Sequence, residues 1–104
     1  MRSKNPTKFQ LAVWAVCAKI PKGKVSTYTK IARAIDKPKA ARAVGNALNK
    51  NPHASVPCHR VIRSDGSIGG FAHGTKKKIE MLRKEGVKIK NGKTLTTHLL
   101  LNLK

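Results

Sequence analysis

The sequence predicts a mostly α-helical fold with a small β-hairpin, arranged as a winged-helix-like helix-turn-helix domain. Its first half contains three segments with apolar residues at helical spacing, and a tight turn separates the second segment from the third. Its second half contains short β-type segments separated by turn residues. The chain has 104 residues, the length of one domain, and we expect residues 1–104 to form a single unit.

The first predicted helix begins at Asn5-Pro6, because asparagine is a favourable N-cap and proline fits the first helical position. It continues to Ile20, after which Pro21-Lys22-Gly23 ends it. Its apolar stripe comprises Phe9, Ala12, Val13, Val16, Cys17 and Ile20. We therefore expect Cys17 to be packed in the core.

The next two predicted helices form the helix-turn-helix. The second has Ser26 as its expected N-cap and ends at Lys37-Pro38, and the third ends at Asn51-Pro52. Their buried faces are predicted to contain Tyr28, Ile31, Ala32 and Ile35 in the second helix and Ala40, Val44, Ala47 and Leu48 in the third. Lys39 and Arg42 head the third helix, where a helix-turn-helix contacts its partner.

The middle of the chain changes character. Residues 52–60 have two prolines and no periodicity, which predicts a fixed loop. Residues 61–63 then form a candidate strand, residues 64–67 a hairpin turn, and Ile68 the start of the return strand. Gly69-Gly70 is expected to let the backbone pass close to another group.

The last third of the chain predicts one more helix and a second turn. Thr75 is the expected N-cap of a helix that ends at Gly86 and turns Ile79 and Leu82 inward. Asn91-Gly92 predicts a further hairpin turn, and the apolar residues 99–103 predict a segment packed on the domain.

The charge of the chain predicts a polyanionic partner. Its 23 basic and 4 acidic residues give a formal net charge of +19, and basic residues are spread over both halves. Such a surface is typical of a nucleic-acid-binding protein. Four acidic residues are too few to favour a carboxylate-based metal nuclease or a glycosidase. No apolar run is long enough to span a membrane, and the N-terminal residues lack the apolar core of a secretory signal.

The cysteines and histidines argue against a metal site. The two cysteines, Cys17 and Cys58, are far apart and no C-x-x-C occurs, and the four histidines lack metal-ligand spacing. We therefore expect no metal and no cofactor, and a reducing intracellular compartment such as the cytoplasm or nucleoid. Cys58 itself has two readings, a buried small hydrophobe or a nucleophile whose thiolate is favoured by the adjacent His59 and Arg60.

Several motifs together resemble the active domain of the O6-alkylguanine-DNA alkyltransferases, the DNA-repair methyltransferases that react once. The resemblance is carried by Pro57-Cys58-His59-Arg60-Val61 and by the order of the motifs around it, and it covers about residues 6–87. The surrounding motifs are Val25-Ser26-Thr27-Tyr28, Ala41-Arg42-Ala43-Val44-Gly45, Asn51-Pro52, Gly69-Gly70-Phe71 and Glu85-Gly86. Residues 88–104 match no part of the family's pattern, and we expect an active domain without the family's usual N-terminal domain.

The resemblance implies how the chain binds double-stranded DNA that contains O6-alkylguanine. The third predicted helix would enter the minor groove, where the small residues Ala41, Ala43 and Gly45 allow close approach, with Lys39 beside them. Arg42 would fill the space left by the flipped-out guanine. Tyr28 would promote the rotation of the phosphate. We expect the protein to act as a monomer.

The resemblance also implies the chemistry. Cys58 would attack the alkyl carbon, and Tyr28 would donate a proton toward N3 of the leaving guanine. His59 would act on Cys58 as a base through a water molecule, and Glu85 would orient His59.

The guanine pocket implied by the resemblance has five members. Backbone groups of Cys58, Val61 and the 71–72 loop would hold the guanine edge, Phe71 would wall the pocket, and Asn51 and Pro57 would fix the active-site loop. Ala72 stands where some relatives have serine, so only its backbone would contact O6.

Two other functions are compatible with parts of this pattern. A non-enzymatic alkyltransferase-like protein binds alkylated DNA but usually has another residue, often tryptophan, in place of Cys58. An architectural DNA-binding protein would account for the charge, but it would not need Cys58 and His59 beside the other motifs.

Overall fold

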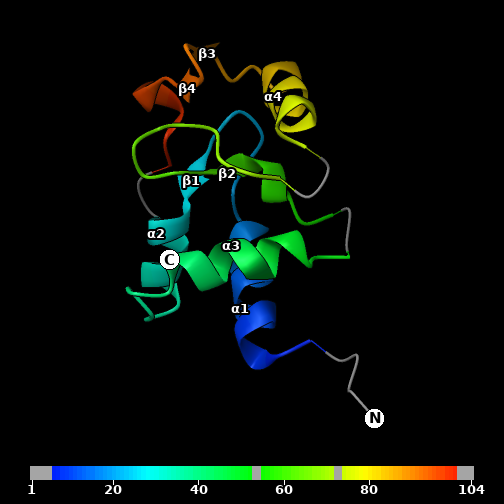
Figure 1. The fold of residues 1–104 in the computed structure, drawn as a ribbon, viewed down its shortest axis with the longest axis vertical. Coiled ribbons are helices and arrows are strands. Elements are labelled where there is room, and N and C mark those ends of the chain that lie inside the picture. The colour runs from blue at the N-terminus through cyan, green and yellow to red at the C-terminus, as the bar shows by residue number, and fades with distance from the viewer. Residues whose placement is uncertain (1–5, 53–54, 72–73, 101–104) are drawn as a thin grey trace.

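The computed structural model describes residues 6–52, 55–71 and 74–100, and within them it contains four α-helices (Figure 1). The mostly helical, winged-helix-like prediction is confirmed. In chain order the elements are α1 (Lys8–Cys17), β1 (Ser26–Thr27), α2 (Tyr28–Ala34), α3 (Ala41–Asn49), the 3-10 helix η1 (Cys58–Arg60), β2 (Val61–Ile62), α4 (Thr75–Lys84), β3 (Ile89–Lys90), β4 (Lys93–Thr94) and the 3-10 helix η2 (Thr96–His98). Helices α1 to α3 lie at one end of the molecule, and α4 with β3 and β4 lies at the other (Figure 1).

Helix α1 begins later than the sequence predicted. Its N-cap is Thr7, whose hydroxyl accepts a hydrogen bond from the Gln10 backbone N–H at 3.0 Å, while the Gln10 side chain accepts one from the Thr7 N–H at 2.9 Å. This reciprocal capping box satisfies two backbone donors and therefore defines the start of the helix. The predicted cap Asn5 lies outside the described residues. The helix ends at Cys17 rather than Ile20, although Ile20 is buried as expected.

The cap of α2 is Thr27, not Ser26. Thr27 has extended backbone angles, and its hydroxyl accepts a hydrogen bond from the Lys30 backbone N–H at 3.1 Å. Ser26 is instead buried in β1, where it pairs with Val61. The predicted inner faces are otherwise confirmed, and α1, α2 and α3 share one core. Its buried members are Val13, Trp14, Cys17, Ile20, Ile31, Ala32, Val44, Ala47, Leu48 and Val61.

The first hairpin prediction was wrong. Strand β2 pairs with β1 in parallel, in the register Ser26 to Val61 and Thr27 to Ile62. The turn at residues 64–67 does form, with the Arg63 N–H donating to the Ser67 carbonyl at 2.9 Å. Ile68 does not pair with β2, because its side chain is buried in a second core and its N–H donates to the Gly92 carbonyl.

Two features, one in the segment 52–60 and one at the start of α4, also differ in detail from the prediction. Residues 58–60 form η1 within the segment predicted as a loop. Gly74, in a left-handed conformation at φ 93°, precedes α4, so Thr75 is the first helical residue rather than the N-cap. As predicted, the backbone leaves α4 through the left-handed Gly86.

The second core lies between the sheet, α4 and the C-terminal segment. Its buried members are Val25, Ile62, Ile68, Leu82 and Val87, and Ile79, Ile89 and Leu99 pack against them. The predicted turn at Asn91-Gly92 joins β3 and β4, which pair antiparallel. Leu99 forms a bridge with Val25 and Leu100 packs on the first core, which confirms the packing role for the described part of residues 99–103.

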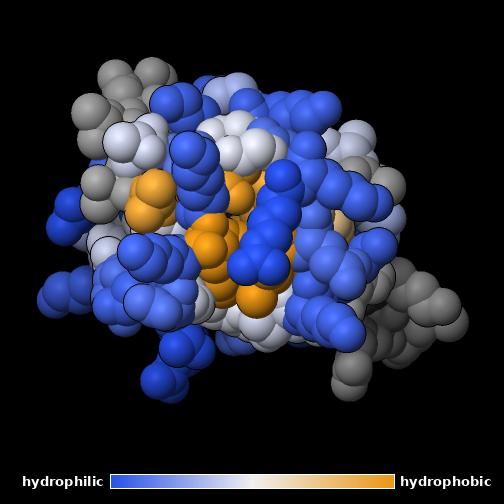
Figure 2. Space-filling view, turned by 90° about the horizontal axis from the view of Figure 1, so that it is seen from above, coloured by the Kyte–Doolittle hydropathy of each residue, from blue (hydrophilic) through white to orange (hydrophobic). Residues whose placement is uncertain are grey.

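The surface is dominated by basic side chains. Figure 2 looks onto the end of the molecule formed by α4 and the β3–β4 hairpin, and hydrophilic residues cover most of this face around a small apolar area. Among the described residues, no helix is long and apolar enough to cross a membrane.

Candidate active site

Cys58 lies between the core formed by α1 to α3 and the part of the domain that contains α4. It is the first residue of η1, it is half-buried, and it packs against the core formed by α1 to α3. The Asn51 side-chain amide donates a hydrogen bond to its sulfur at 3.2 Å, and the thiol can donate to the Leu48 carbonyl at 3.5 Å. The segment after α3 therefore holds the sulfur from two sides, and Pro57, buried directly before it, fixes the approach of the chain.

The surroundings of Cys58 favour its thiolate. The largest influence on the pKa of Cys58 is a hydrogen bond from the Cys17 thiol, which lowers it against the opposing effect of burial. Together with the hydrogen bond from Asn51 and the positive charge of Lys78, it brings this pKa down to about 7. The same contact with Cys58 raises the pKa of Cys17. Cys17 is fully buried, as predicted, but its place on an apolar helical stripe did not indicate that its thiol would lie against the candidate nucleophile.

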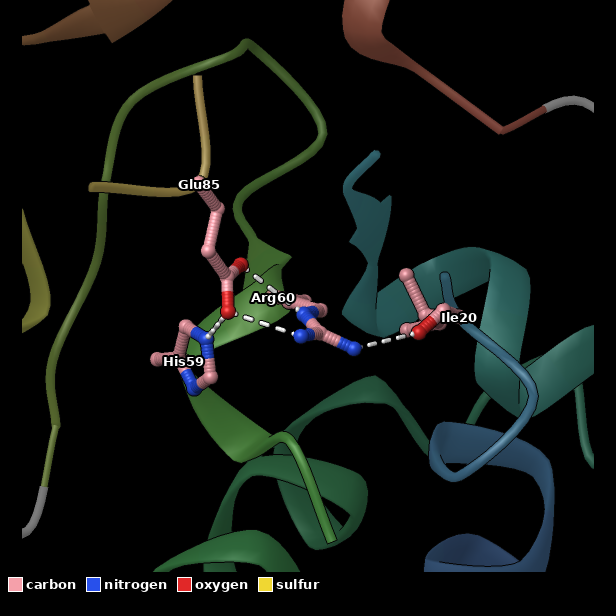
Figure 3. A network of polar contacts seen from close by, with 4 residues as sticks. All are labelled: Ile20, His59, Arg60 and Glu85. Atoms are coloured by element: carbon pink, nitrogen blue, oxygen red, sulfur yellow. Dashed lines mark hydrogen bonds and ion pairs between the residues drawn. The ribbon is translucent and has the colours of Figure 1, made fainter. Parts of the chain in front are cut away.

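Glu85 joins two neighbours of Cys58 (Figure 3). Its carboxylate lies 2.9 Å from His59 Nε2 and accepts two hydrogen bonds from Arg60, at 2.9 Å from Nε and 2.7 Å from Nη2. Arg60 also donates from Nη1 to the Ile20 carbonyl at 2.8 Å. The network therefore ties η1 to the end of α4 and to the chain after α1. The sequence motif contained Arg60, but its role as the main partner of Glu85 was missed.

The Glu85 carboxylate is held in its charged form. Burial by itself would raise its pKa, but the hydrogen bonds from Arg60 and His59 and their charges hold it below its usual range. Because Arg60 and His59 share one carboxylate, the orientation of the His59 ring depends on both partners. His59 is buried, with 6% of its surface exposed.

Tyr28 is the first residue of α2 and is half-buried. Its hydroxyl donates to the Gly70 carbonyl at 3.4 Å and accepts from Lys78 Nζ at 3.4 Å. Burial raises the pKa of Tyr28. A Cβ on Gly69, which has φ 75°, would lie 3.2 Å from this hydroxyl, so the predicted close approach at this glycine is confirmed.

A cavity of about 500 Å³ opens between α3 and the Tyr28 ring. Its lining contains Tyr28, Thr29, Ala41, Arg42, Gly45, Asn46, Asn49, Arg63, Ser64 and Gly70. Gly45 is the position where α3 passes the ring, since a Cβ there would lie 3.7 Å from Tyr28 Cε1. Arg42 and Ala43 are exposed on α3, and Lys39 is exposed in the preceding turn.

The remaining predicted pocket residues differ in how deeply they are buried, and one of them lies outside the described residues. Val61 is fully buried in β2 and Phe71 is half-buried, while Ala72 lies outside the described residues. Arg63, Asn46 and Asn49 line the cavity and were missed, because exposed polar residues at these positions have no distinguishing pattern in the sequence. Among the residues that the structure describes, no three histidine, cysteine or acidic side chains are grouped as metal ligands would be.

Comparison with known proteins places this geometry in a family. The family described as "6-O-methylguanine DNA methyltransferase, DNA binding domain" matches residues 8–87. The methylated-DNA–protein-cysteine methyltransferase of Methanosarcina acetivorans is 49% identical over 81 residues, which are 77% of this chain and 52% of that protein. The bifunctional transcriptional activator/DNA repair enzyme Ada of Escherichia coli is 45% identical over 80 residues, 76% of this chain and 23% of that protein. The chain thus spans about half the length, or less, of these curated relatives.

Solved structures give the same result. The crystal structure of Mycobacterium tuberculosis OGT in complex with DNA matches 78% of this chain and 51% of that chain, with TM-score 0.75 and 43% identity. Atl1 of S. pombe, solved in complex with damaged DNA containing O6-carboxymethylguanine, matches 98% of this chain and 100% of that chain, with TM-score 0.81 and 35% identity. The Atl1 match therefore extends into the C-terminal residues that the sequence motifs left unassigned. The chain belongs to the 6-O-methylguanine DNA methyltransferase family, to the part of it that forms the DNA-binding domain.

Proposed function

We propose that the protein repairs DNA by transferring an alkyl group from O6-alkylguanine to Cys58, once per molecule. The observation that carries the proposal is the environment of Cys58. Hydrogen bonds from Cys17 and Asn51 lower the pKa of Cys58 and so favour its thiolate, within a motif that also provides a His59–Glu85 pair. A buried cysteine with only a packing role needs neither feature.

The face formed by α3 and the cavity suits duplex DNA. Ala41, Ala43 and Gly45 are small, so the backbone of α3 can approach the floor of a minor groove, and the exposed Arg42 can enter the stack. The cavity beside Tyr28 is within the size range of small-molecule pockets. A flipped guanine entering this cavity would meet Tyr28, which lines it, whereas Cys58 is not among the lining residues.

The proposed reaction is an in-line displacement. The Cys58 sulfur forms a bond to the alkyl carbon, the bond from that carbon to O6 breaks, and its electron pair passes to the guanine. Tyr28 donates a proton toward guanine N3, which makes the base a better leaving group. His59 acts as base toward Cys58 through a water molecule, with its ring oriented by Glu85. The thioether product is stable, so we expect a single turnover.

A second function is favoured by one observation. Atl1, solved with damaged DNA, matches 98% of this chain and 100% of the Atl1 chain. This supports a lesion-binding protein that acts without transfer. Cys58 supports the first proposal, because the alkyltransferase-like proteins that the sequence resembles usually lack this nucleophile.

One assay separates the two functions. The protein is incubated with duplex DNA that carries O6-methylguanine labelled in the methyl group, and label on the protein is counted. Transfer predicts close to one label per molecule, none with Cys58→Ala, and retained DNA binding by that variant. Cys17→Ala keeps the nucleophile, so this variant should still take up close to one label per molecule, although more slowly because it loses the contact that favours the thiolate. Tight lesion binding by the unmodified protein without any label would refute the transfer and support the second function.

A further inference from the structure

The exposed side of α4 and the β3–β4 hairpin beside it carry mostly positive charge. In residues 75–95, seven basic side chains are exposed, and Glu80 is the exposed acidic residue. The other acidic residue of this stretch, Glu85, is directed to His59 and Arg60. The seven basic residues, which we call the α4 basic face, are Lys76, Lys77, Arg83, Lys84, Lys88, Lys90 and Lys93.

The α4 basic face is formed by packed elements at one end of the molecule. Helix α4 and the hairpin lie together at this end (Figure 1). Ile79 of α4 and Ile89 of β3 pack against the same core, which holds the two elements in place. Seen from this end, hydrophilic side chains surround a small apolar area (Figure 2). The charges are therefore presented as one surface and not as a loose tail.

On α4 this surface is turned away from the cavity beside Tyr28. Lys78 marks the inner side of the helix, because its Nζ donates to the Tyr28 hydroxyl and the Gly70 carbonyl, and both of these residues line the cavity. At 3.6 residues per turn, Lys76 and Lys84 lie about 120–160° from Lys78 around the helix. A duplex held against α3 and the cavity therefore lies on the opposite side of α4 from these charges.

The size and chemistry of the α4 basic face fit the phosphate backbone of a duplex. Lys77 and Lys84 are seven residues apart on α4, which is about 10 Å along the helix axis. Duplex DNA carries one charge per about 1.7 Å of its axis, so a stretch of this length presents about six phosphates. An acidic protein partner would need an apolar centre of contact. Of the described residues in this part of the chain, Leu95 is the one large hydrophobic residue that is exposed, so the face favours DNA.

We propose that the α4 basic face is a second DNA-binding site, which holds the backbone of a duplex other than the one that α3 contacts. Its contacts are to phosphates, so binding there depends neither on base sequence nor on damage. One molecule then holds two DNA segments at once and can pass from one to the other without leaving DNA. The inference rests on the proposed function only in that α3 holds the first segment, and it does not require alkyl transfer.

A bridging assay tests this proposal. A short biotinylated duplex is immobilised on beads, protein is added at low salt, and retention of a second, fluorescent duplex is measured. The unmodified protein should retain the second duplex. The triple variant Lys77→Gln, Lys84→Gln, Lys88→Gln should lower this retention on the order of 10-fold and lower the salt dependence of second-duplex binding by about 3 in log–log slope, because three phosphate contacts are lost. Its binding to a single duplex through α3 should stay within about twofold of normal.

A charge-matched variant is the control. Lys8→Gln, Lys19→Gln, Lys22→Gln also removes three exposed positive charges, but from α1 and the turn that follows it, and it should bridge like the unmodified protein. Equal losses in the two triple variants would assign bridging to the total charge of the chain and overturn the proposal. Sedimentation of the bridged complex should give one protein copy for each pair of duplexes. Two copies for each pair would assign the bridge to contact between proteins and would also overturn it.

Lysine protection tests the site without any variant. The protein is acetylated with and without excess undamaged duplex, and the modified lysines are identified by mass spectrometry. The duplex should protect Lys77, Lys84 and Lys88 and leave Lys8 and Lys19 reactive. Unchanged reactivity of Lys77, Lys84 and Lys88 would show that no DNA lies on this face.

A competitor distinguishes DNA from an acidic protein as the partner. Poly-glutamate, added at the same concentration of negative charge, should displace the second duplex less than unlabelled duplex does. Equal displacement would assign the face to acidic polypeptides and contradict the proposal. A protein that binds a single duplex normally but retains no second one overturns only the second site, whereas a protein that binds no duplex at all overturns the proposed function.

Discussion

Replacing Glu85 with glutamine should destabilise the domain far more than a typical surface substitution. The side chain is 12% exposed and accepts hydrogen bonds from three side-chain nitrogens, two of them on Arg60 and one on His59. Glutamine has nearly the same shape but only one acceptor oxygen, and its amide group faces the guanidinium with a donor. Arg60, which is 17% exposed, would then keep its charge without a countercharge.

The magnitude follows from this geometry. Removing one partner of a buried ion pair costs about 3–5 kcal/mol, and the partial exposure of Arg60 brings the expected loss below that range, to about 2–3 kcal/mol. For a domain of this size, a loss of 1 kcal/mol lowers Tm by about 4–8 °C, so we expect a decrease of roughly 10–20 °C. Thermal unfolding followed by circular dichroism measures it, with Glu80→Gln on the exposed face of α4 as the control.

The pH dependence provides a second measure of the same interaction. Because the folded state holds the pKa of Glu85 below its usual value, the carboxylate stabilises the fold above the ordinary glutamate pKa of about 4.3. This contribution disappears as pH falls through the lower folded pKa. The difference between the unmodified protein and Glu85→Gln should therefore be largest near pH 7 and shrink at the acid end. A loss at pH 7 below about 0.5 kcal/mol, or one that is independent of pH, would refute the assignment of this network as the tie between η1 and α4.

Three further changes test other parts of the site. Asn51→Ala should raise the pKa of Cys58 and so slow its reaction with iodoacetamide at pH 7 but not at pH 10, and an unchanged pH profile would contradict the hydrogen bond to sulfur. Gly69→Ala should lower the stability of the fold by about 1–2 kcal/mol, because its φ is 75° and its Cβ would approach the tyrosine hydroxyl, whereas Gly70→Ala has open space and should cost less in thermal unfolding. Arg42→Ala should slow repair of O6-alkylguanine in a duplex more than reaction with free O6-benzylguanine, and equal losses in the two assays would argue against a role in base flipping.

Much of the fold could be predicted because local patterns decide it. The apolar stripes of α1, α2 and α3 lie in the core as their spacing indicated, and Gly86 ends α4. The predictions were wrong where a contact with a residue distant in the sequence decides between two locally favourable structures. Ser26 and Thr27 are both good caps, and Thr27 has this role because Ser26 pairs with Val61 in a strand contact between segments 35 residues apart.

In the candidate site, too, some features could be predicted from the sequence and others could not. The motif around Cys58 and its pairing of His59 with Glu85 could be predicted, the latter from the family resemblance. The contact from Cys17 could not, because a cysteine on an apolar helical face has the same sequence pattern whether or not its sulfur touches another. Lys78 could not either, since three consecutive lysines are typical of a solvated helix and only the packing of α4 shows which of them turns inward.

The two inward-facing cations of the site differ in what they can do because of their partners. Arg60 is neutralised by two hydrogen bonds to Glu85, and a guanidinium retains its proton, so this pair can only hold the structure in place. Lys78 faces a phenol and a carbonyl, and its burial makes its proton easier to release. The chain has only 4 acidic residues against 23 basic ones, and one of those acids, Glu85, pairs with Arg60, the cation that stays charged. Lys78 is left with a carbonyl and a phenol as its partners, so burial lowers its pKa to about 8.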